Sequence, residues 1–415
     1  MLDLLKDFSV SDTYDCGDNT VMYVIENAVK GDFERVCSEA EKSGYIKIDG
    51  NIIDTVIAST YRKDTLLHIY FSQPENKIRV INDAFSAEYK TRPEKSGNYA
   101  NTLWQFEVDH SLIDCGMCYI IRCSDGSFFM IDSAHWYSVN DDIRIIDFLK
   151  KISGEEKPRI KGWFFSHAHE DHIGKFLDIL NYYSSCLEID TLYYNFPSPS
   201  HRDAPWELPF FNAMKAFREL VDEHKEINHV KLHTGMKFAV DNLEVTVLCT
   251  HEDVHPAPTQ DFNNTSTVIS VKAAASTVLF PGDASFYSDK VMISRYTDAL
   301  RCDIVQVAHH GHSGTSPLFY KRAGAKCALF PVTVIKFDEE YDRQESNRTA
   351  IEIAAEYHIA SNGTAEIHLP YEQGKTKILP DETFEDFDGI FNLWCYEYTP
   401  ERKQQLYDEY LKRRG

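Results

Sequence analysis

The arrangement of apolar and polar residues divides the chain into two parts. Within residues 1–100, apolar runs of strand length surround one segment, 33–40, whose apolar side chains have helical spacing. From about residue 102, short apolar runs alternate with amphipathic segments such as 210–221. Strands that alternate with helices in this way predict an α/β sandwich rather than an all-α or all-β fold.

The same pattern predicts three regions. Residues 1–100 form a small α+β accessory domain, 101–380 form the main domain, and 381–415 form a C-terminal extension to which we assign no chemistry. The polar segment 90–101 is the predicted linker. The first region carries no cluster of metal ligands and no phosphate-binding glycine motif, so we expect it to shape substrate access or a homodimer contact.

One dense cluster of polar residues directly follows a predicted buried strand. The apolar run 163–165 leads into His167, His169, Asp171 and His172, and a helical pattern begins immediately afterwards. Neutral imidazole and carboxylate are the natural ligands of zinc and its neighbours in the first transition row. Four such side chains in six positions exceed what a simple helix cap requires, so this loop is a predicted metal site.

Two later segments carry further candidate ligands for a metal bound at this cluster. The strand 277–280 runs into a Gly-Asp turn, and the carboxylate of Asp283 can bridge two cations, which a histidine cannot do. Another apolar strand delivers His309, His310 and His312 into a glycine-containing loop. By position we expect His309 to complete the second metal's shell, although either of the first two histidines could serve. His310 and His312 are then the candidates for donating protons or hydrogen bonds to a substrate oxyanion.

These segments resemble a known family. The run 167–172 is similar to the His-x-His-x-Asp-His signature of the metallo-β-lactamase superfamily, and Asp283 occupies the place of that family's Gly-Asp motif. Two apolar strands joined by Asp-Gly, within 118–132, resemble its opening hairpin, whose last aspartate, here Asp132, commonly supports the metal site by a hydrogen bond. The resemblance implies a four-layer αββα sandwich and a metal-dependent hydrolase domain over 101–380.

A narrower resemblance comes from three short segments. Asn-Asn-x-Ser at 263–266, together with 279–284 and 307–313, resembles the hydrolase domain of ComEC-type competence proteins and their stand-alone bacterial relatives. The likeness covers roughly residues 102–369 and does not extend to the first hundred residues.

The sequence departs from the superfamily pattern at Asn264. Many relatives carry a histidine ligand just before this strand, and an amide oxygen is a weaker, harder ligand that favours Mn²⁺ over tightly bound Zn²⁺. His251 or His255 on the preceding loop is the alternative source of an imidazole. The predicted cofactors are two divalent cations, Zn²⁺ or Mn²⁺. His167, His169 and Asn264 hold one of them, Asp171, His172 and His309 hold the other, and Asp283 bridges both.

The predicted function is hydrolysis by a hydroxide formed at this dinuclear site, with a phosphodiester as the expected substrate and Asp171 as a residue required for catalysis. The first alternative is hydrolysis of a carboxylic ester, thioester or lactone by the same hydroxide. An alternative of another class is a non-catalytic metal-binding module that recruits a partner through residues 1–100.

Bulk composition narrows the substrate and the setting. The chain has 43 basic and 65 acidic residues, a net charge of −22, so long duplex nucleic acid is an unfavourable partner and a small-molecule or nucleotide-type substrate is expected. No signal peptide or membrane-spanning segment is visible. Ten cysteines without a secretion signal predict reduced thiols. We therefore expect a soluble, cytoplasmic protein with no membrane partner.

Overall fold

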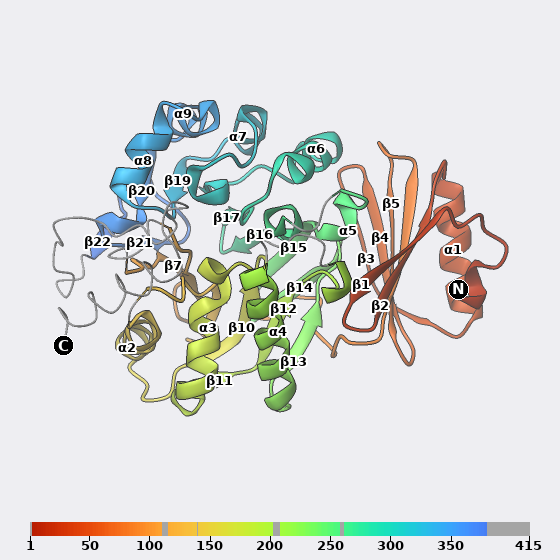
Figure 1. Cartoon of the computed structure of the whole chain (residues 1–415), viewed down its shortest axis with the longest axis horizontal. Helices are drawn as coiled ribbons and strands as arrows, with labels where there is room; N and C mark the ends of the chain where they lie inside the picture. The colour runs from red at the N-terminus through yellow and green to blue at the C-terminus, as the bar shows by residue number, and fades with distance from the viewer. Residues whose placement is uncertain (1, 110–114, 139, 202–207, 258–260, 380–415) are drawn as a thin grey trace.

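The computed structural model shows a chain of two parts (Figure 1). One part is a single sheet with a helix on its outer side, and the other is a larger body of two sheets with helices on both sides. The residues described are 2–109, 115–138, 140–201, 208–257 and 261–379. The predicted C-terminal extension, residues 381–415, therefore lies outside the described residues, which end at residue 379.

The first part, here called the N-terminal module (residues 2–83), is a six-stranded antiparallel sheet with strand order β1-β2-β6-β5-β4-β3. Its helix α1 buries Phe33, Val36 and Ala40 against one face of the sheet, as the helical spacing predicts. The elements are η1 (Asp3–Leu5), β1 (Asp12–Gly17), β2 (Thr20–Ile25), α1 (Lys30–Lys42), β3 (Ile46–Ile53), β4 (Val56–Arg62), β5 (Leu66–Ser72) and β6 (Lys77–Asp83).

The second part, here called the sandwich domain (residues 101–379), begins with a mixed sheet of order β13-β12-β10-β9-β8-β7-β21-β22, and β11 also pairs with β10. The predicted Asp-Gly hairpin is the antiparallel pair β8–β9. The strands are β7 (Thr102–Gln105), β8 (Tyr119–Arg122), β9 (Phe128–Ile131), β10 (Arg159–Phe165), β11 (Glu188–Ile189), β12 (Thr191–Tyr194), β13 (Asn228–Lys231), β21 (Thr364–His368) and β22 (Lys377–Leu379). In the described part of this half, the α-helices are α2 (Asp141–Ser153), α3 (Glu170–Tyr183) and α4 (Leu208–Glu223).

The second sheet has strand order β14-β15-β16-β17-β18-β19-β20. Its strands are β14 (Lys237–Val240), β15 (Leu243–Cys249), β16 (Val268–Ala273), β17 (Ser276–Phe280), β18 (Ile304–Gln306), β19 (Cys327–Phe330) and β20 (Glu356–Ile359). The helices of this half are α5 (His251–Val254), α6 (Phe286–Arg295), α7 (Pro317–Ala323), α8 (Val334–Tyr341) and α9 (Glu345–Ile353). Two short 3₁₀ turns lie near the candidate site, η5 (Phe262–Thr265) and η6 (Ala308–Gly311). Other 3₁₀ turns of the sandwich domain are η2 (Ser184–Cys186), η3 (Pro199–His201) and η7 (Ala360–Asn362).

Three hydrophobic cores define the layers of the sandwich domain. Phe164 and Phe280 belong to the core between the two sheets, whereas Trp163 and Phe165 face the core beneath α2, α3 and α4. A third core lies between the second sheet and the helices α6 to α9. Alternate side chains of a central strand point to opposite faces, so an uninterrupted apolar run is what a strand buried on both faces requires. The four-layer αββα sandwich is confirmed.

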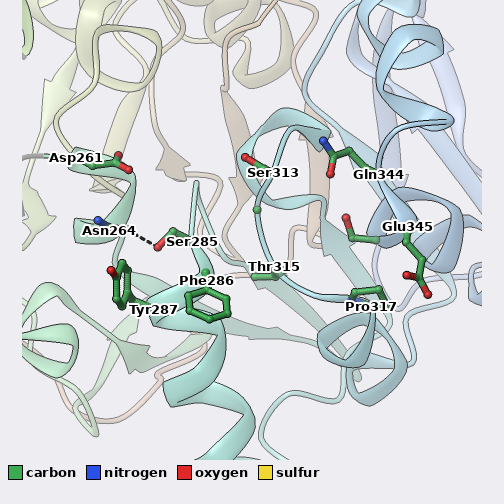
Figure 2. Close-up of a pocket in the computed structure, with 12 residues that line it drawn as sticks. Asp261, Asn264, Ser285, Phe286, Tyr287, Ser313, Thr315, Pro317, Gln344 and Glu345 are labelled. Atoms are coloured by element: carbon green, nitrogen blue, oxygen red, sulfur yellow. Dashed lines mark hydrogen bonds between the residues drawn. The ribbon is translucent and has the colours of Figure 1, made fainter. Parts of the chain in front are cut away.

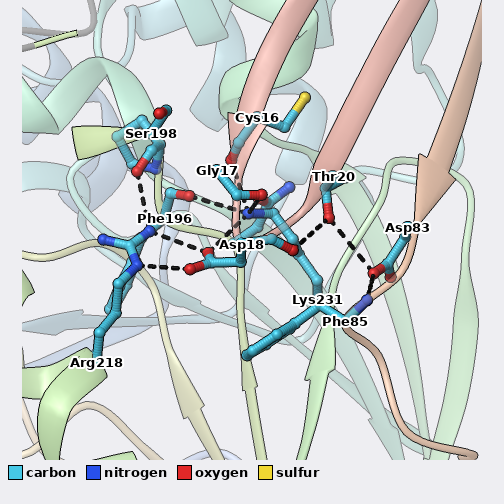
Figure 3. Close-up of polar contacts among 12 residues, drawn as sticks. Cys16, Gly17, Asp18, Thr20, Asp83, Phe85, Phe196, Ser198, Arg218 and Lys231 are labelled. Atoms are coloured by element: carbon cyan, nitrogen blue, oxygen red, sulfur yellow. Dashed lines mark hydrogen bonds and ion pairs between the residues drawn. The ribbon is translucent and has the colours of Figure 1, made fainter. Parts of the chain in front are cut away.

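A buried lysine joins the two parts of the chain (Figure 3). Lys231, at the end of β13, is fully buried and donates to the carbonyl oxygens of Cys16 at 2.7 Å and Phe196 at 3.2 Å. Its ammonium also contacts Asp18 Oδ2 at 3.0 Å, and Arg218 donates to both oxygens of that carboxylate. The turn between β1 and β2 is thus held against the sandwich domain by two cations.

Further buried charges line the same interface. His233 contacts Glu252 at 2.8 Å within the sandwich domain and Asp83 of the N-terminal module at 3.4 Å. Arg295 donates to Asp253 at 2.6 Å and to Glu75 of the module at 2.9 Å. Buried charges are tolerated only when they are paired, so these contacts commit the module to one position on the sandwich domain.

The predicted linker 90–101 packs along the surface of the sandwich domain. The backbone N–H of Glu94 donates to the carbonyl of Asp241 at 2.7 Å, and the hydroxyl of Ser96 donates to the carboxylate of the same residue. Among the described residues, no helix is long and apolar enough to cross a membrane.

Candidate metal centre

The candidate ligands gather where strands of both sheets end. The loop after β10 carries the His-rich cluster, the turn after β17 carries Asp283, and the turn η6 after β18 carries His309 and His310. Because β17 and β18 are parallel neighbours, the two segments that follow them leave the sheet at the same edge. The first sheet packs face to face on the second, which brings the end of β10 to that edge as well.

Two groups of metal-ligand atoms meet here, with the atoms in each group within 4.8 Å of one another. The first group consists of Asp171, His172, Asp283 and His310, and the second consists of His167, His169 and Asp283, all of them buried. Asp283 belongs to both groups, as a bridging carboxylate would.

The distances between side chains within the first group are short. His310 Nε2 lies 2.8 Å from Asp171 Oδ2 and 3.4 Å from Asp283 Oδ2. His172 Nε2 lies 3.3 Å from the same oxygen of Asp283 and 3.3 Å from His310 Nε2. Two imidazole nitrogens and two carboxylates therefore face one small volume.

Hydrogen bonds on the far side of two imidazoles set their orientation. His172 Nδ1 donates to Asp132 Oδ2 at 2.7 Å, and His310 Nδ1 donates to the carbonyl of Pro331 at 2.7 Å. These hydrogen bonds occupy Nδ1 of both rings, so Nε2 is the nitrogen of each ring that faces the centre and would bind a cation there. Asp132 is itself held by the backbone N–H and hydroxyl of Ser166 at 2.8 and 2.7 Å. The supporting hydrogen bond predicted for Asp132 is confirmed.

The second group is arranged similarly. His167 Nε2 lies 3.0 Å from His169 Nδ1 and 3.9 Å from Asp283 Oδ2. His167 Nδ1 contacts the hydroxyl of Ser166 at 3.1 Å. The carboxylate of Asp283 thus stands between the two pairs of histidines.

Burial and neighbouring charges act in opposite directions on the pKa values of Asp171, Asp283 and His310. Burial alone would raise the pKa values of Asp171 and Asp283, but His172 and His310 outweigh it and hold both values well below the ordinary range. Burial would lower the pKa of His310, yet Asp283 and Asp171 raise it to about 10. Burial and the neighbouring His172 and His169 instead hold the pKa of His167 well below its usual value. Both carboxylates are therefore ionised.

The residues present fit a divalent cation. Asp283 Oδ1 is buried and makes no hydrogen bond to any residue the structure describes, so this acceptor lacks the partner that buried oxygens normally have. Imidazole nitrogens and carboxylate oxygens are the donors that Zn²⁺ and Mn²⁺ take in proteins. A cation bound between these side chains would displace the Nε2 protons of His172 and His310 and be held by the same nitrogen and oxygen atoms.

The structure brings His310 into a ligand group and leaves His309 outside both groups, the reverse of the order expected from position alone. His309 Nε2 lies 4.0 Å from Asp283 Oδ2 and 3.3 Å from Asn263 Nδ2. Both histidines adopt the left-handed backbone conformation (φ 51° and 53°), which turns the chain so that the second imidazole is the buried one. His312 Nδ1 lies 3.6 Å from Glu340, at the edge of the centre.

The structure also places the three residues that could supply the ligand for which many relatives use a histidine. Asn264 Oδ1 accepts a hydrogen bond from the hydroxyl of Ser285, and its role as a metal ligand stays a prediction. His251 contacts Asn195 at 2.9 Å, and His255 contacts Asp12 of the N-terminal module at 2.7 Å. Neither of these histidines joins a ligand group.

Sequence reasoning missed buried neighbours of the centre. The thiol of Cys115 lies 3.6 Å from Asp171 Oδ2, and His135 Nε2 lies 3.9 Å from Glu170 Oε1. Glu170 stands inside the histidine-rich motif, which was the available signal, whereas nothing in the local sequence marks His135. Tertiary packing alone brings Cys115 and His135 to the centre.

A cavity of about 460 Å³ opens beside the centre (Figure 2). Asn264, Ser285 and Thr315 line it, together with the aromatic side chains of Phe286 and Tyr287. Because Ser285 follows Asp283 closely in the chain and Asn264 adjoins Asn263, which contacts His309, this space adjoins the ligand groups.

The chain is similar to several solved structures at low sequence identity. Among solved structures, the metallo-beta-lactamase fold protein YhfI from Bacillus subtilis is 13% identical, with a TM-score of 0.39 over 62% of this chain and 96% of that one. CmlA, a diiron beta-hydroxylase from Streptomyces venezuelae, is 12% identical, with a TM-score of 0.33 over 65% of this chain and 45% of that one. The short form of human tRNase Z is 12% identical, with a TM-score of 0.31 over 55% of this chain and 91% of that one.

No curated protein matches the sequence. The family model of the metallo-beta-lactamase superfamily matches residues 116–316, which span the hairpin β8–β9, the histidine-rich loop, Asp283 and His310. This match shows that residues 116–316 are similar to the metallo-beta-lactamase superfamily.

Proposed function

We propose that the protein is a metal-dependent hydrolase with a dinuclear centre and that its substrate is a small phosphodiester. The observation that carries the proposal is the position of Asp283, whose carboxylate belongs to both ligand groups. A carboxylate shared by two sets of imidazoles is the arrangement that holds two cations side by side. A structural ion-pair network would not need the partnerless Oδ1 of this residue.

Each cation has an assigned set of protein ligands. His167, His169 and Asp283 would hold one, with Asn264 as a further ligand, and Asp171, His172, His310 and Asp283 would hold the other. When bound, the cations would supply positive charge for the attacked group and favour deprotonation of water. Asp132 and the carbonyl of Pro331 keep His172 and His310 in the tautomer that presents Nε2.

The remaining imidazoles are the candidates for binding substrate. Since His310 belongs to a ligand group, His309 and His312 are the histidines left to donate hydrogen bonds to a substrate oxygen. His309 is about one quarter exposed and lies close to Asp283, so a substrate oxygen at the centre is within its reach. In this role the two side chains would orient the substrate and stabilise negative charge on it.

A phosphodiester is favoured by two considerations. Paired divalent cations suit displacement at phosphorus, where the attacking and leaving oxygens both carry negative charge. The segments 263–266, 279–284 and 307–313 resemble those of ComEC-type hydrolases. A net charge of −22 further favours a small substrate over a long nucleic acid.

The test is hydrolysis of bis(p-nitrophenyl) phosphate by protein stripped of metal and reloaded with Mn²⁺ or Zn²⁺. Asp171→Asn should lower turnover at least about a hundredfold, because it removes a charged ligand. Asp178→Asn is the matched control, since it changes an aspartate on the same helix that contacts Lys175 at 2.8 Å and no residue of the ligand groups.

Each alternative function has its own outcome. Metal-dependent cleavage of p-nitrophenyl acetate without cleavage of the phosphodiester would replace the proposal by a carboxylic-ester hydrolase. Tight binding of two metal ions per chain with no turnover of either compound would favour the metal-binding module. Turnover that persists in Asp171→Asn would refute the assignment of the centre.

A further inference from the structure

The cavity beside the metal centre is built from the segments that carry the candidate ligands. Asn264 follows the residue that contacts His309, Ser285 follows Asp283 closely, and Ser313 accepts a contact from His309 Nδ1 through its carbonyl at 3.5 Å. A substrate whose reacting group lies against Asp283 has this cavity as the neighbouring space for its remaining substituent. The lining of the cavity therefore bears on which substituent is accepted.

The charges around the cavity have one sign. Among the described residues that line it, none is lysine, arginine or histidine, whereas Asp261 and Glu345 both are carboxylates. Figure 2 shows these two side chains on opposite sides of the space. Lys290 is close by, with its ammonium 4.2 Å from the centroid of the Phe286 ring, but it is not a lining residue.

The uncharged part of the lining combines rings with hydrogen-bonding groups. Phe286 is 58% exposed and Tyr287 is 41% exposed, so both rings are accessible at the cavity. Ser285, Thr315 and Gln344 contribute hydroxyl and amide groups around them. Exposed rings beside such groups suit a flat substituent with polar edges.

We propose that this cavity selects the substituent that lies beyond the reacting bond, that it accepts an uncharged ring-bearing group, and that it rejects an anionic one. The inference rests on the hydrolytic function proposed above and deepens it. It defines the substrate as a small diester whose negative charge is confined to the reacting phosphate. A nucleic acid strand is excluded, because each neighbouring nucleotide would bring a further phosphate towards Asp261 and Glu345.

Two thymidine esters that differ only in one phosphate test this selection. Thymidine 5′-(p-nitrophenyl phosphate) and its 3′-phosphorylated form release the same p-nitrophenolate from the same bond. Repulsion between a phosphate dianion and two carboxylates across a cavity of this size corresponds to about tenfold in kcat/KM at low ionic strength, falling as salt is added. We expect the uncharged 3′-hydroxyl form to be the better substrate by about that factor.

Substitutions at Glu345 and Asp261, which line the cavity, test whether these residues cause the preference between the two esters. Glu345→Lys should remove most of the preference, and Asp261→Asn should reduce it while keeping an oxygen that can accept from the backbone N–H of Asn263. Glu352→Lys, on the same helix α9 but outside the cavity lining, makes the same change of charge and should leave the preference unaltered.

The outcomes separate this inference from the proposed function. Equal kcat/KM for the two esters, unchanged in Glu345→Lys, would overturn the inference and leave the hydrolytic function standing. Hydrolysis of neither ester would count against the function, and calorimetric titration would then decide the inference. Tighter binding of thymidine 5′-phosphate than of thymidine 3′,5′-bisphosphate supports the selective cavity, whereas equal or reversed affinities, or no binding of either, overturn it.

Discussion

Replacement of Lys231 by methionine tests whether one buried cation holds the N-terminal module on the sandwich domain. The substitution keeps an unbranched chain as far as Cε, with sulfur in place of the Cδ methylene, and removes the ammonium. In the protein this group donates to the carbonyls of Cys16, Gly17 and Phe196 and contacts Asp18 Oδ2, over distances of 2.7 to 3.2 Å (Figure 3). All four acceptors lose this donor when methionine takes its place.

The expected loss of stability depends on which contacts remain after the ammonium is removed. Breaking a buried ion pair by removing one partner destabilises by about 3–5 kcal/mol, because an uncompensated charge stays behind. Here Asp18 keeps two hydrogen bonds from Arg218, at 2.6 and 2.9 Å, so its charge remains paired. The three carbonyls lose the charged donor itself, and a buried acceptor left without a donor costs about 1–3 kcal/mol. The lower end of the range, about 3 kcal/mol, is therefore the expected loss.

Hydrogen exchange during urea titration is the suitable assay, because it reports on amides of β1 and β2 separately from those of the sandwich domain. Lys231→Met should lower the free energy of opening at these strands by about 3 kcal/mol. Lys237→Met is the control, since that ammonium lies 3.3 Å from Glu244 with 25% of its side chain exposed, and surface pairs contribute less than about 1 kcal/mol. Equal effects of the two substitutions would refute the reasoning.

Three further predictions follow from individual contacts. Asp132→Asn should weaken metal binding about 10–100-fold in a chelator competition titration, because His172 loses its charged partner; unchanged affinity would contradict this. Burial lowers the pKa of His233, but the carboxylates of Glu252 and Asp83 outweigh burial and raise this pKa from 6.5 to about 9. The folded protein therefore holds this proton more tightly than the unfolded chain, and the free energy of unfolding should fall by up to about 3 kcal/mol as pH rises from 6.5 to 9. His233→Gln should abolish this dependence on pH. Gly174→Ala should destabilise the protein by about 1–3 kcal/mol in thermal unfolding, because a Cβ there would meet the backbone of Trp136; an unchanged melting temperature would show that this loop yields.

Much of the fold could be predicted because its signals are local. The run 163–165 is apolar at every position, which only a strand buried on both faces requires, and the Asp-Gly turn between β8 and β9 specifies its hairpin from two residues. The ligands His167, His169 and Asp171 are equally local, because all three lie between the end of β10 and the first turn of α3. Short-range patterns of this kind depend little on the rest of the chain.

The choice between His309 and His310 could not be made in the same way. Adjacent histidines offer the same chemistry, and a turn with φ of 51° and 53° decides which ring faces Asp283. The conformation depends on how η6 packs beneath Pro331, whose carbonyl receives His310 Nδ1. That contact joins residues from the ends of two different strands, and no periodicity in the sequence records it.

By itself the sequence determined the α/β sandwich class, the hairpin and the chemistry of the metal ligands, because side-chain polarity and turn residues act within a few positions. Only the tertiary structure decided which groups meet across long separations, such as Lys231 with Asp18 and Asp283 with His172. A buried charge is stable only beside its partner, and that partner is specified by strand pairing and sheet packing rather than by spacing. The same packing placed two carboxylates around the cavity at the centre's edge.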